Sequence, residues 1–346
     1  MALSLGILDQ SIVHPGSTPG EALRGTIRLA QVAEELGYDR FWVAEHHDSP
    51  GVAGSSPEVL ISHLLARTER IRIGSGGVML QHYSPYKVAE NFNVLASLAP
   101  GRVELGIGRA PGGLPRSTQA LQGVGKQGQA GDLEAKLGEL EQYLGGPADG
   151  SHPLAGVQAS PLPERPADIH LLGTSVSSAE LAARRGYPYA FALFINNDPD
   201  TAARAFETYR TAFDYSTGRR PRAILALSVI ASDTEEEAAA LAGEFKNVRV
   251  TLASGKTVNV GTLEQAEEFA RQAGETFTAE VRDADITRGT KAQVRERLLE
   301  LAGIYGVKEL LFTTILPDLA QRERSIRLIK EAFEELPVGA DRTGGA

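Results

Sequence analysis

The sequence predicts an α/β protein in which eight parallel strands close into a (β/α)8 barrel, the TIM-barrel architecture, with insertions at the carboxyl-terminal face. Short apolar or β-branched runs alternate with segments that have a 3.6-residue apolar period, which is the pattern of βα units around a parallel sheet. The strand candidates number eight, the count that closes a barrel, whereas a doubly wound sheet usually has fewer strands.

The expected elements alternate along the chain. The strand candidates are residues 3–8, 40–44, 71–74, 103–107, 169–172, 189–194, 224–231 and 309–315. The helix candidates are residues 21–36, 57–68, 85–98, 177–185, 200–213, 234–245, 291–305 and 319–333. In the first helix, Leu23, Ile27 and Ala30 recur at steps of three and four before Gly37 ends the helix.

Composition excludes several classes of protein. With 35 basic and 44 acidic residues, the chain has a formal charge of −9 and lacks the positive surface of a nucleic-acid binder. It has no cysteine, which excludes disulfides, zinc–thiolate sites, iron–sulfur clusters and a cysteine nucleophile. The start lacks a basic region and reaches an acid at Asp9, so we expect no signal peptide. No apolar run approaches the ~20 residues that span a bilayer. We therefore expect a cytoplasmic protein without a membrane segment.

No break in composition marks a second domain. We expect one domain over residues 1–336 and a flexible tail over 337–346. Two stretches, residues 112–168 and 247–290, interrupt the βα pattern. Because the loops at the carboxyl end of a barrel hold its active site, these stretches are expected to cover a pocket.

The two stretches differ in content. The first has a helix candidate over residues 132–144 and then a Gly/Pro-rich loop, and the second has a polar hairpin-like part and a helix near residues 263–272. Together with the second stretch, Tyr83, Tyr86 and Leu114 are the candidates to line the substrate pocket.

Two adjacent histidines follow the second strand in the run RFWVAEHHD. Side chains of neighbouring residues on extended backbone point to opposite sides, so at most one of His46 and His47 can face the barrel mouth. A histidine pair is often no more than a hydrogen-bonded part of a polar loop. Its position at the carboxyl end of a barrel strand favours catalysis. No third ligand stands at a suitable spacing, so we expect no metal site.

Glycines interrupt the third strand in the run IRIGSGGVML. Gly74, Gly76 and Gly77 weaken a strand and indicate either a simple bulge or the close approach of another group. The functional interpretation is a flat ring that lies against this backbone, where a Cβ atom would obstruct it.

An arginine and a hydroxyl-rich helix start lie one strand apart. Arg109 ends the fourth strand and offers a fork of donors suited to phosphate or carboxylate, although a structural ion pair is as common a role. Thr174, Ser175 and Ser178 precede or begin the helix after the fifth strand, where free N–H groups and the helix dipole bind anions. Ser175 also suits an ordinary N-cap, and the two roles are compatible. The combination predicts a phosphate site.

Taken in order, the runs EHH, GSGGVML, RVELGIGR and LGTSVSSAELAARRGYPYA resemble those of the bacterial luciferase-like monooxygenases, a family of flavin-dependent (β/α)8 barrels. The resemblance covers roughly residues 3–335 and is cleanest over residues 40–113 and 169–191. It is poor in the two interrupting stretches.

The resemblance implies a role for each matching residue. His46, the first histidine of EHH, would be the catalytic histidine. A non-prolyl cis peptide under the flavin ring would fall at Gly76–Gly77. The residues that would contact the FMN phosphate are Arg109, Thr174, Ser175 and Ser178.

The resemblance also implies the reaction: a monooxygenase that uses reduced FMN and O2, through a C4a-peroxyflavin, on an apolar substrate such as an aldehyde or another carbonyl compound. We expect His46 to be the general acid/base, because an imidazole pKa of ~6.5 suits proton transfer near neutrality. Glu45 is the candidate to orient it. A separate NAD(P)H:flavin reductase would supply reduced FMN, since no second nucleotide site is visible. Family members commonly form homodimers.

Some features separate this chain from the light-emitting enzymes of the family. Those enzymes have a reactive cysteine near the flavin and an acidic residue where Thr174 stands, so light emission is not implied. Three alternatives stay open: an F420- or FMN-dependent hydride-transfer enzyme of the same fold, a non-catalytic flavin-binding barrel, and a solute-binding α/β protein. The last would need an export signal, which the sequence lacks.

Overall fold

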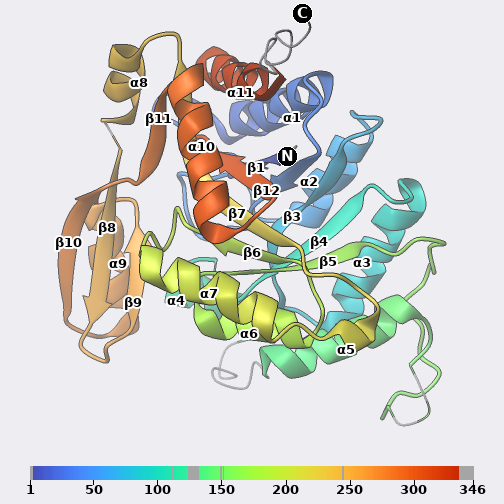
Figure 1. Cartoon of the computed structure of the whole chain (residues 1–346). Coiled ribbons are helices and arrows are strands. Elements are labelled where there is room, and N and C mark those ends of the chain that lie inside the picture. Colours follow the sequence, from blue (N-terminus) through green and yellow to red (C-terminus); the bar gives the residue numbers. More distant parts are fainter. Residues whose placement is uncertain are drawn as a thin grey trace, which may run out of the picture.

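The predicted barrel is confirmed by the computed structural model, which describes residues 3–110, 112–123, 132–148, 150, 152–243 and 245–334. Within these residues, eight parallel strands pair in the order β1–β2–β3–β4–β5–β6–β7–β12, and β12 pairs with β1 to close the sheet (Figure 1). The strands are β1 (Ser4–Asp9), β2 (Arg40–Val43), β3 (Arg72–Met79), β4 (Val103–Gly108), β5 (Asp168–Gly173), β6 (Tyr189–Ala192), β7 (Ala223–Ser232) and β12 (Glu309–Thr313). Each overlaps a strand candidate, although β3 runs to Met79 where the candidate ended at residue 74.

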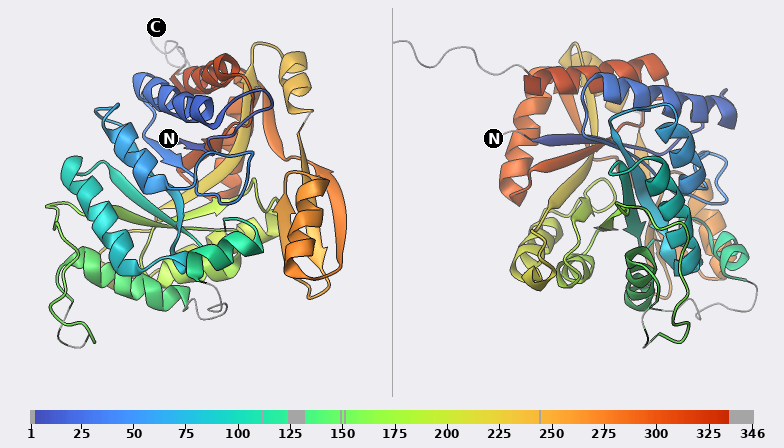
Figure 2. Two further views of the ribbon diagram at one scale, coloured as in Figure 1. Left: turned by 180° about the vertical axis from the view of Figure 1, so that it is seen from behind. Right: turned by 90° about the vertical axis from the view of Figure 1, so that its right-hand side faces the viewer.

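Helices surround the strands, as the right-hand view of Figure 2 shows. The helices that connect or follow these strands include α1 (Pro19–Glu35), α2 (Pro57–Leu65), α3 (Pro85–Leu98), α6 (Val176–Arg184), α7 (Pro199–Thr211), α10 (Lys291–Tyr305) and α11 (Leu319–Glu334). Local sequence fixes their ends. At the start of α1, the Thr18 hydroxyl accepts from the Glu21 N–H at 3.2 Å, and the Glu21 carboxylate accepts from the Thr18 N–H at 2.7 Å. Gly37, with φ +75°, leads the chain out of the helix.

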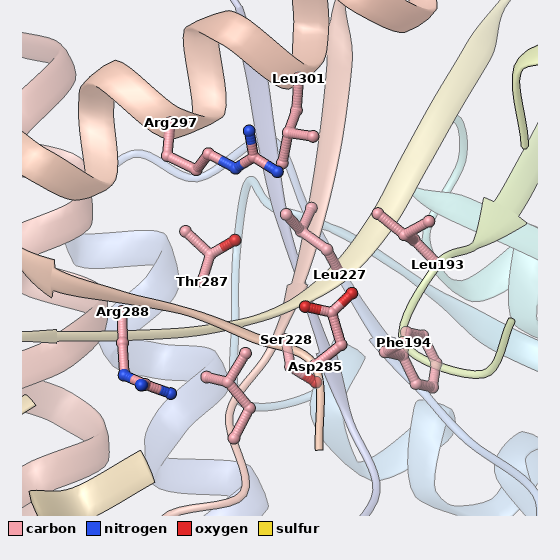
Figure 3. Close-up of a pocket in the computed structure, with 10 residues that line it drawn as sticks. Leu193, Phe194, Leu227, Ser228, Asp285, Thr287, Arg288, Arg297 and Leu301 are labelled. Atoms are coloured by element: carbon pink, nitrogen blue, oxygen red, sulfur yellow. The ribbon is translucent and has the colours of Figure 1, made fainter. Parts of the chain in front are cut away.

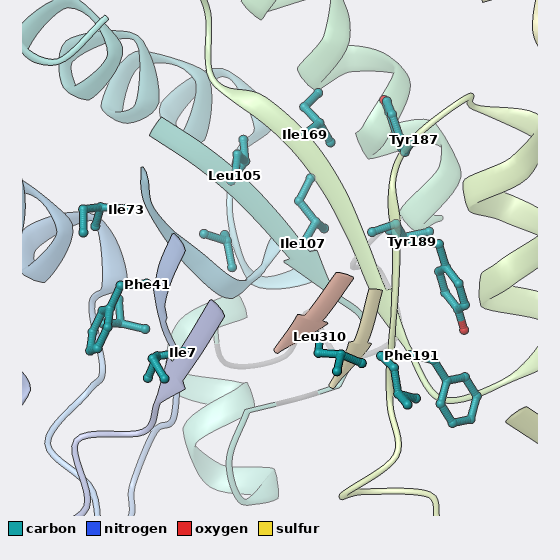
Figure 4. Packing of buried hydrophobic residues seen from close by; sticks show 14 of the residues in the cluster. Ile7, Phe41, Ile73, Leu105, Ile107, Ile169, Tyr187, Tyr189, Phe191 and Leu310 are labelled. Carbon is teal, nitrogen blue, oxygen red and sulfur yellow. The ribbon is translucent and has the colours of Figure 1, made fainter. Parts of the chain in front are cut away.

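Side chains of the strands alternate between the barrel interior and the helical layer. On β2, Trp42 packs inside with Leu8 of β1 and Leu311 of β12, whereas Phe41 and Val43 pack against the helices. Figure 4 shows part of the outer cluster, where apolar side chains of several strands lie under the helices. The barrel is therefore filled, and its strands read as apolar runs because both sides are buried.

Buried charges fill the amino-terminal end of the barrel interior. The Glu104 carboxylate, 1% exposed, accepts hydrogen bonds from Arg40 Nε at 3.0 Å, Arg72 Nη1 at 3.0 Å and Trp42 Nε1 at 2.6 Å. Arg40 is fully buried and also donates to Glu309 at 2.6 Å. Burial alone would raise the pKa of Glu104, but the guanidinium of Arg40, followed by His170, Arg72 and the Trp42 N–H, lowers that pKa to about 2. The carboxylate is thus charged at all ordinary pH values.

The first insertion, between β4 and β5, contains α5 (Leu133–Gly145), which confirms the helix expected over residues 132–144. It also contains α4 (Pro115–Gln122), so the expectation of a single helix there is wrong. The sequence of α4, PRSTQALQ, has no buried residue and therefore no apolar period to reveal it.

The second insertion follows β7 and forms a lobe beside the barrel, at the left of Figure 1. After α8 (Glu235–Ala242), three antiparallel strands pair in the order β10–β8–β9 against α9, which confirms the expected hairpin and helix. The chain then returns through β11, which pairs in parallel with the second half of β7. These elements are β8 (Lys246–Leu252), β9 (Thr257–Val260), α9 (Leu263–Ala273), β10 (Phe277–Asp283) and β11 (Ile286–Thr290).

The lobe touches loops at the carboxyl end of the barrel. Leu114, at the start of α4, packs on its core, and Asn259 Nδ2 donates to the carbonyl of Ile195, just after β6, at 2.8 Å. In the part of the chain that the structure describes, no helix is long and apolar enough to cross a bilayer. The tail expected over residues 337–346 lies outside the described residues.

The buried charges lead to a prediction about stability. Replacing Glu104 by Gln removes one of the two carboxylates that pair with the buried Arg40 guanidinium. We therefore expect the free energy of unfolding at pH 7 to fall by roughly 3–5 kcal/mol. Because the folded-state pKa of Glu104 is depressed from its ordinary value of 4.5, its contribution is present above pH 4.5 and is lost as the pH falls toward 2. Urea unfolding between pH 3 and 7 measures both effects.

The matched control is Glu90→Gln on α3. Glu90 pairs with Lys87 at 3.0 Å, but the Lys87 side chain is 65% exposed, so the expected change is within about 0.5 kcal/mol. Equal stabilities of the two variants would show that the buried network does not hold the barrel together.

Candidate active site

His46 lies at the carboxyl end of β2, on the side of the chain that faces the barrel interior. Trp42 and Ala44 belong to the interior cluster, and the alternation continues to His46. The His46 N–H donates to the carbonyl of Gly54 at 2.8 Å, while Nδ1 is buried without a hydrogen-bond partner among the described residues. Burial, with a smaller contribution from His47, lowers the pKa of His46 below 6.5. The ring is therefore neutral at pH 7 and able to accept a proton.

Glu45 and His47 lie on the opposite side of the same segment. The Glu45 carboxylate, 1% exposed, lies 2.8 Å from His47 Nε2, and accepts from the Tyr83 hydroxyl at 2.8 Å and the Met79 N–H at 3.1 Å. The prediction that Glu45 orients His46 is therefore wrong, because residues two apart share a side of extended chain and adjacent residues do not. Glu45 holds His47 instead.

The glycines of β3 allow very close contact with β4. The register shifts between Ser75 and Val78, which confirms a bulge, and the Gly76–Gly77 peptide is cis, as the family resemblance implies. A Cβ on Gly77 would lie 2.7 Å from the carbonyl oxygen of Gly106, and one on Gly76 would lie 2.6 Å from Leu8 Cδ1. The packing of the barrel wall thus already requires glycine at position 77, where the neighbour is backbone, whereas at position 76 the close neighbour is the end of the Leu8 side chain.

Arg109 and the start of α6 lie at neighbouring strand ends. Ile107 of β4 pairs with Leu171 of β5, so Arg109 follows β4 at the level where Gly173 ends β5. Arg109 is exposed, and among the described residues its guanidinium has no hydrogen-bond or ion-pair partner. The predicted arginine and the predicted helix start therefore follow adjacent strands at the same end of the barrel.

The hydroxyl groups at the start of α6 have different surroundings. Ser175 is the N-cap: its Oγ accepts from the Ser178 N–H at 3.3 Å. Ser178 Oγ donates to the Ser175 carbonyl at 2.7 Å and lies 3.0 Å from the Tyr189 hydroxyl. The hydroxyl proton of Ser178 is therefore already engaged in the hydrogen bonds that cap the helix. Thr174 is half-buried, and its carbonyl accepts from Asn196 Nδ2 at 2.9 Å, while its hydroxyl has no hydrogen bond among the described residues. Ser177, which is exposed, is a further hydroxyl on this turn.

The residues expected to line a substrate pocket have other contacts. Tyr83 binds Glu45, the Tyr86 hydroxyl donates to the Gln158 carbonyl at 3.2 Å, and Leu114 packs against the lobe. Tyr83 also borders a cavity of about 450 Å³ between α2 and α3, on the outer flank of the barrel.

A smaller cavity, of about 250 Å³, lies at the carboxyl end of β6 and β7 (Figure 3). Its walls come from the end of β6, from β7, from the β11 segment and from α10. Sequence reasoning did not identify these residues, because they lie far apart in the chain and form no local motif. The one available signal was that the stretch 247–290, which supplies the β11 side, was expected to cover a pocket.

Comparison with known proteins identifies the family. Residues 3–307 match the model of the luciferase-like monooxygenase family, and the chain belongs to that family. It is similar to the N-acetyl-S-alkylcysteine monooxygenase of Bacillus subtilis, with 41% identity over 95% of this chain and 98% of the relative. The solved structure of apo-MsnO8 superposes with a TM-score of 0.78 at 35% identity, covering 97% of this chain and 99% of that one.

Two more distant structures share the fold and differ in cofactor. The oxygenating constituent of 3,6-diketocamphane monooxygenase from Pseudomonas putida, a complex with FMN, has a TM-score of 0.72 at 21% identity, covering 97% of this chain and 99% of that one. An F420-dependent secondary alcohol dehydrogenase with an F420–acetone adduct has a TM-score of 0.65 at 15% identity, covering 96% of this chain and 99% of that one. These likenesses establish the barrel and leave the cofactor open.

The close contact at the β3 bulge can be tested through stability. In Gly77→Ala, the new Cβ meets the backbone of β4, which cannot move as a flexible side chain can, so we expect a loss of about 1–3 kcal/mol. Gly145→Ala, at the end of α5, is the control: nothing lies within 4 Å of its Cβ position. That variant should be unchanged or stabilised by up to about 1 kcal/mol. Urea unfolding compares the two, and a Gly77→Ala protein as stable as Gly145→Ala would refute the packing argument.

Proposed function

We propose that the protein is a flavin-dependent monooxygenase that binds reduced FMN at the carboxyl end of the barrel and transfers one oxygen atom from O2 to a small substrate. The observation that carries the proposal is the order of residues around the barrel mouth. His46 ends β2, Gly76–Gly77 lies in β3, the unpaired Arg109 follows β4, and the start of α6 follows β5. These are neighbouring strands, so one elongated cofactor can reach all of them.

The residues present fit a phosphate-bearing cofactor. Arg109 is a cation without a partner in the described part of the chain, and it lies beside the amino-terminal end of α6, whose N–H groups attract anions. Arg109, Thr174 and Ser175 would hold the phosphate. Ser178 would shape the turn through its contacts with Ser175 and Tyr189, which makes its role less direct than the family resemblance implies.

Reduced FMN, when bound, supplies the electrons for the reduction of O2. The protein would orient the cofactor and the substrate, and exclude water from the mouth of the barrel. His46 would move the proton, because its desolvated ring is neutral at pH 7 and the buried Nδ1 has no described partner. The lowered pKa makes it a better proton acceptor than donor at neutral pH.

For the substrate, we propose a small compound that presents an oxidisable carbonyl or sulfur atom on an apolar part of the molecule. An aldehyde is the expectation from the family. The activity of the B. subtilis relative makes an N-acetyl-S-alkylcysteine, a thioether, the first substrate to test.

Two partners remain predictions. A separate NAD(P)H:flavin reductase would supply the reduced FMN, in which case NADH alone should not reduce FMN on the purified protein. A homodimer would cover the apolar side chains that α2 and α3 expose, which include Val59, Val94 and Leu98.

The phosphate site is tested by titrating the protein anaerobically with photoreduced FMN. We expect Arg109→Gln to weaken binding roughly 10- to 100-fold, because a charge-assisted hydrogen bond is lost. Arg70→Gln removes the same charge at the opposite end of the barrel, where Arg70 precedes β3, and should bind as the wild type does. Riboflavin lacks the phosphate, so its affinity should not respond to Arg109→Gln. Equal FMN affinities of the two variants would contradict this site.

The role of His46 is tested in turnover. With photoreduced FMN, O2 and N-acetyl-S-methylcysteine or decanal, we expect His46→Ala to lower product formation by about 10²- to 10⁴-fold with little change in FMN affinity. The control is His63→Ala on the exposed side of α2. Full turnover by His46→Ala would rule out proton transfer by this residue, and FMN binding without any turnover would favour a non-catalytic flavin barrel. Hydride transfer with F420 in place of oxygen uptake would favour the F420-dependent alternative.

A further inference from the structure

Gln81 lies in the short 3-10 helix η1 (Leu80–His82), which follows β3 at the carboxyl end of the barrel. Its side-chain amide reaches the end of β4: Nε2 donates to the carbonyl of Arg109 at 3.1 Å and to the carbonyl of Ala110 at 2.5 Å. A primary amide has two N–H groups, so both hydrogen bonds form at once. Gln81 therefore binds the backbone that carries the arginine of the proposed phosphate site.

The β3–β4 ladder ends just before this contact. Its last pair is Met79 with Gly108, so residues 109 and 110 lie beyond it. Further along the loop, the Gly112 carbonyl accepts from the His47 N–H at 2.7 Å. The Gln81 amide thus extends the link between β3 and β4 by two residues, and the loop after β4 is held on both sides of position 111.

Only the donor half of the Gln81 amide is used. Its Oε1 is buried and has no hydrogen-bond partner among the described residues. Both partners of the amide are carbonyl oxygens, which only accept, so the NH2 group must be the half that faces them. The function of this side chain is therefore donation to the two carbonyls, and another donor of similar length could replace it.

The turn that carries Gln81 is itself held by Lys136 of α5. Lys136 Nζ donates to the carbonyls of Gln81 and Tyr83, each at 3.0 Å, and of Leu80 at 3.4 Å. An ammonium group has three N–H bonds, so these carbonyls engage all of them. The backbone of η1 is thereby anchored to the helical layer, which gives the Gln81 side chain a fixed base.

These contacts affect how an anion is received at Arg109. The Arg109 guanidinium is exposed and has no hydrogen-bond or ion-pair partner among the described residues, so its position depends on its backbone. A backbone that is already fixed reduces the conformational freedom that the arginine loses on binding a phosphate. A carbonyl oxygen repels a phosphate, and the two carbonyls nearest the arginine are engaged by the Gln81 amide.

We propose that Gln81 is a positioning residue of the phosphate site: it holds the Arg109 backbone so that the guanidinium is directed to the start of α6, and it keeps the carbonyls of Arg109 and Ala110 engaged. Gln81 acts through Arg109 and does not touch the phosphate. The inference rests on the proposed function, because the ligand of Arg109 is taken to be the phosphate of FMN.

The test is an anaerobic titration of variants at position 81 with photoreduced FMN. Gln81→Met has a similar length and no donor, so it should weaken FMN binding roughly three- to tenfold. Gln81→Lys restores a donor for the two carbonyls and should bind FMN as the wild type does. Riboflavin, which lacks the phosphate, should bind all three proteins equally. Equal losses of FMN and riboflavin affinity in Gln81→Met, or a Gln81→Lys protein as weak as Gln81→Met, would overturn the proposal.

The matched control is Gln31→Met on α1. Gln31 Nε2 donates to the carbonyl of Arg67 at 3.3 Å, a bond of the same kind, but Arg67 lies between α2 and β3 at the amino-terminal end of the barrel. This variant should bind FMN as the wild type does. If Gln31→Met weakened FMN binding as much as Gln81→Met, the loss would not be specific to the phosphate site and the proposal would fall.

A double variant tests whether Gln81 acts through Arg109. Because the arginine is the group that binds the phosphate, Gln81→Met should not weaken FMN binding further once Arg109→Gln is present. Losses that multiply in the double variant would show that Gln81 acts independently of Arg109, contrary to the proposal.

A spin label reports on the segment without FMN. The chain has no cysteine, so Ala110→Cys, at an exposed position, supplies a single attachment site for a nitroxide. We expect Gln81→Met to raise the mobility of the label in the electron paramagnetic resonance spectrum, and Gln31→Met to leave it unchanged. An unchanged mobility in Gln81→Met would show that the amide does not hold this segment and would overturn the proposal.

The inference and the proposed function fail in different ways. If Arg109→Gln weakens FMN binding and Gln81→Met does not, the phosphate site stands and the role of Gln81 fails. If neither variant alters FMN affinity while Gln81→Met still loosens the label at position 110, Gln81 holds the segment, but the phosphate site at Arg109 fails and the role assigned to Gln81 fails with it.

Discussion

The interaction on which the rest of the structure depends is the burial of the Glu104 carboxylate among cations at the base of the barrel. A charge removed from water is tolerated only where opposite charges and N–H groups replace the solvent, and here Arg40, Arg72 and the Trp42 indole do so. Gly6 makes room for them, since a Cβ there would lie 2.4 Å from Arg40 Cγ. Strands β2, β3, β4 and β12 are thereby tied together at one end, and the proposed active site lies at the other end.

At that other end, backbone hydrogen bonds hold the segment around His46, while its Nδ1 has no hydrogen-bond partner among the described residues. The His46 N–H is bonded to Gly54, the His47 N–H donates to the Gly112 carbonyl at 2.7 Å, and the Glu45 carboxylate binds His47 and Tyr83. These contacts lie on the outer side of the segment. The contacts of this segment therefore fix the position of His46 and leave its ring nitrogen able to accept a proton.

Much of the fold was predictable because each barrel strand is buried on both faces and reads as a continuous apolar run. Where glycine replaces apolar residues, the prediction weakened: β3 was expected to end at residue 74, and it continues to Met79 through the bulge. The helix α4 was missed for another reason: it has no buried residue and so no apolar period. The partner of Glu45 was assigned wrongly because sequence adjacency is not spatial proximity on extended chain.

The small cavity illustrates the limit of such reasoning. Asp285 and Arg288 are ordinary charged residues in a polar stretch, and only the pairing of β11 with β7 brings them to Leu193 and Phe194. No periodicity in the sequence predicts that these residues lie close together, because their proximity depends on how a long insertion returns to the barrel. The phosphate site proposed at Arg109 could be predicted from the sequence, since both of its components stand directly at strand ends.

The path of the second insertion has a consequence for how this barrel can diversify. The chain leaves at the end of β7 and returns through β11, which pairs with residues Ser228 to Ser232 of that same strand, so the two ends of the excursion are neighbours. An excursion anchored in this way can lengthen, shorten or be exchanged between relatives without altering the closure of the barrel. The lobe is therefore a segment that can be exchanged as a unit. Grafting a relative's segment between β7 and β11 would transplant one rim of the cavity and leave the residues of β2 to β5 in their places.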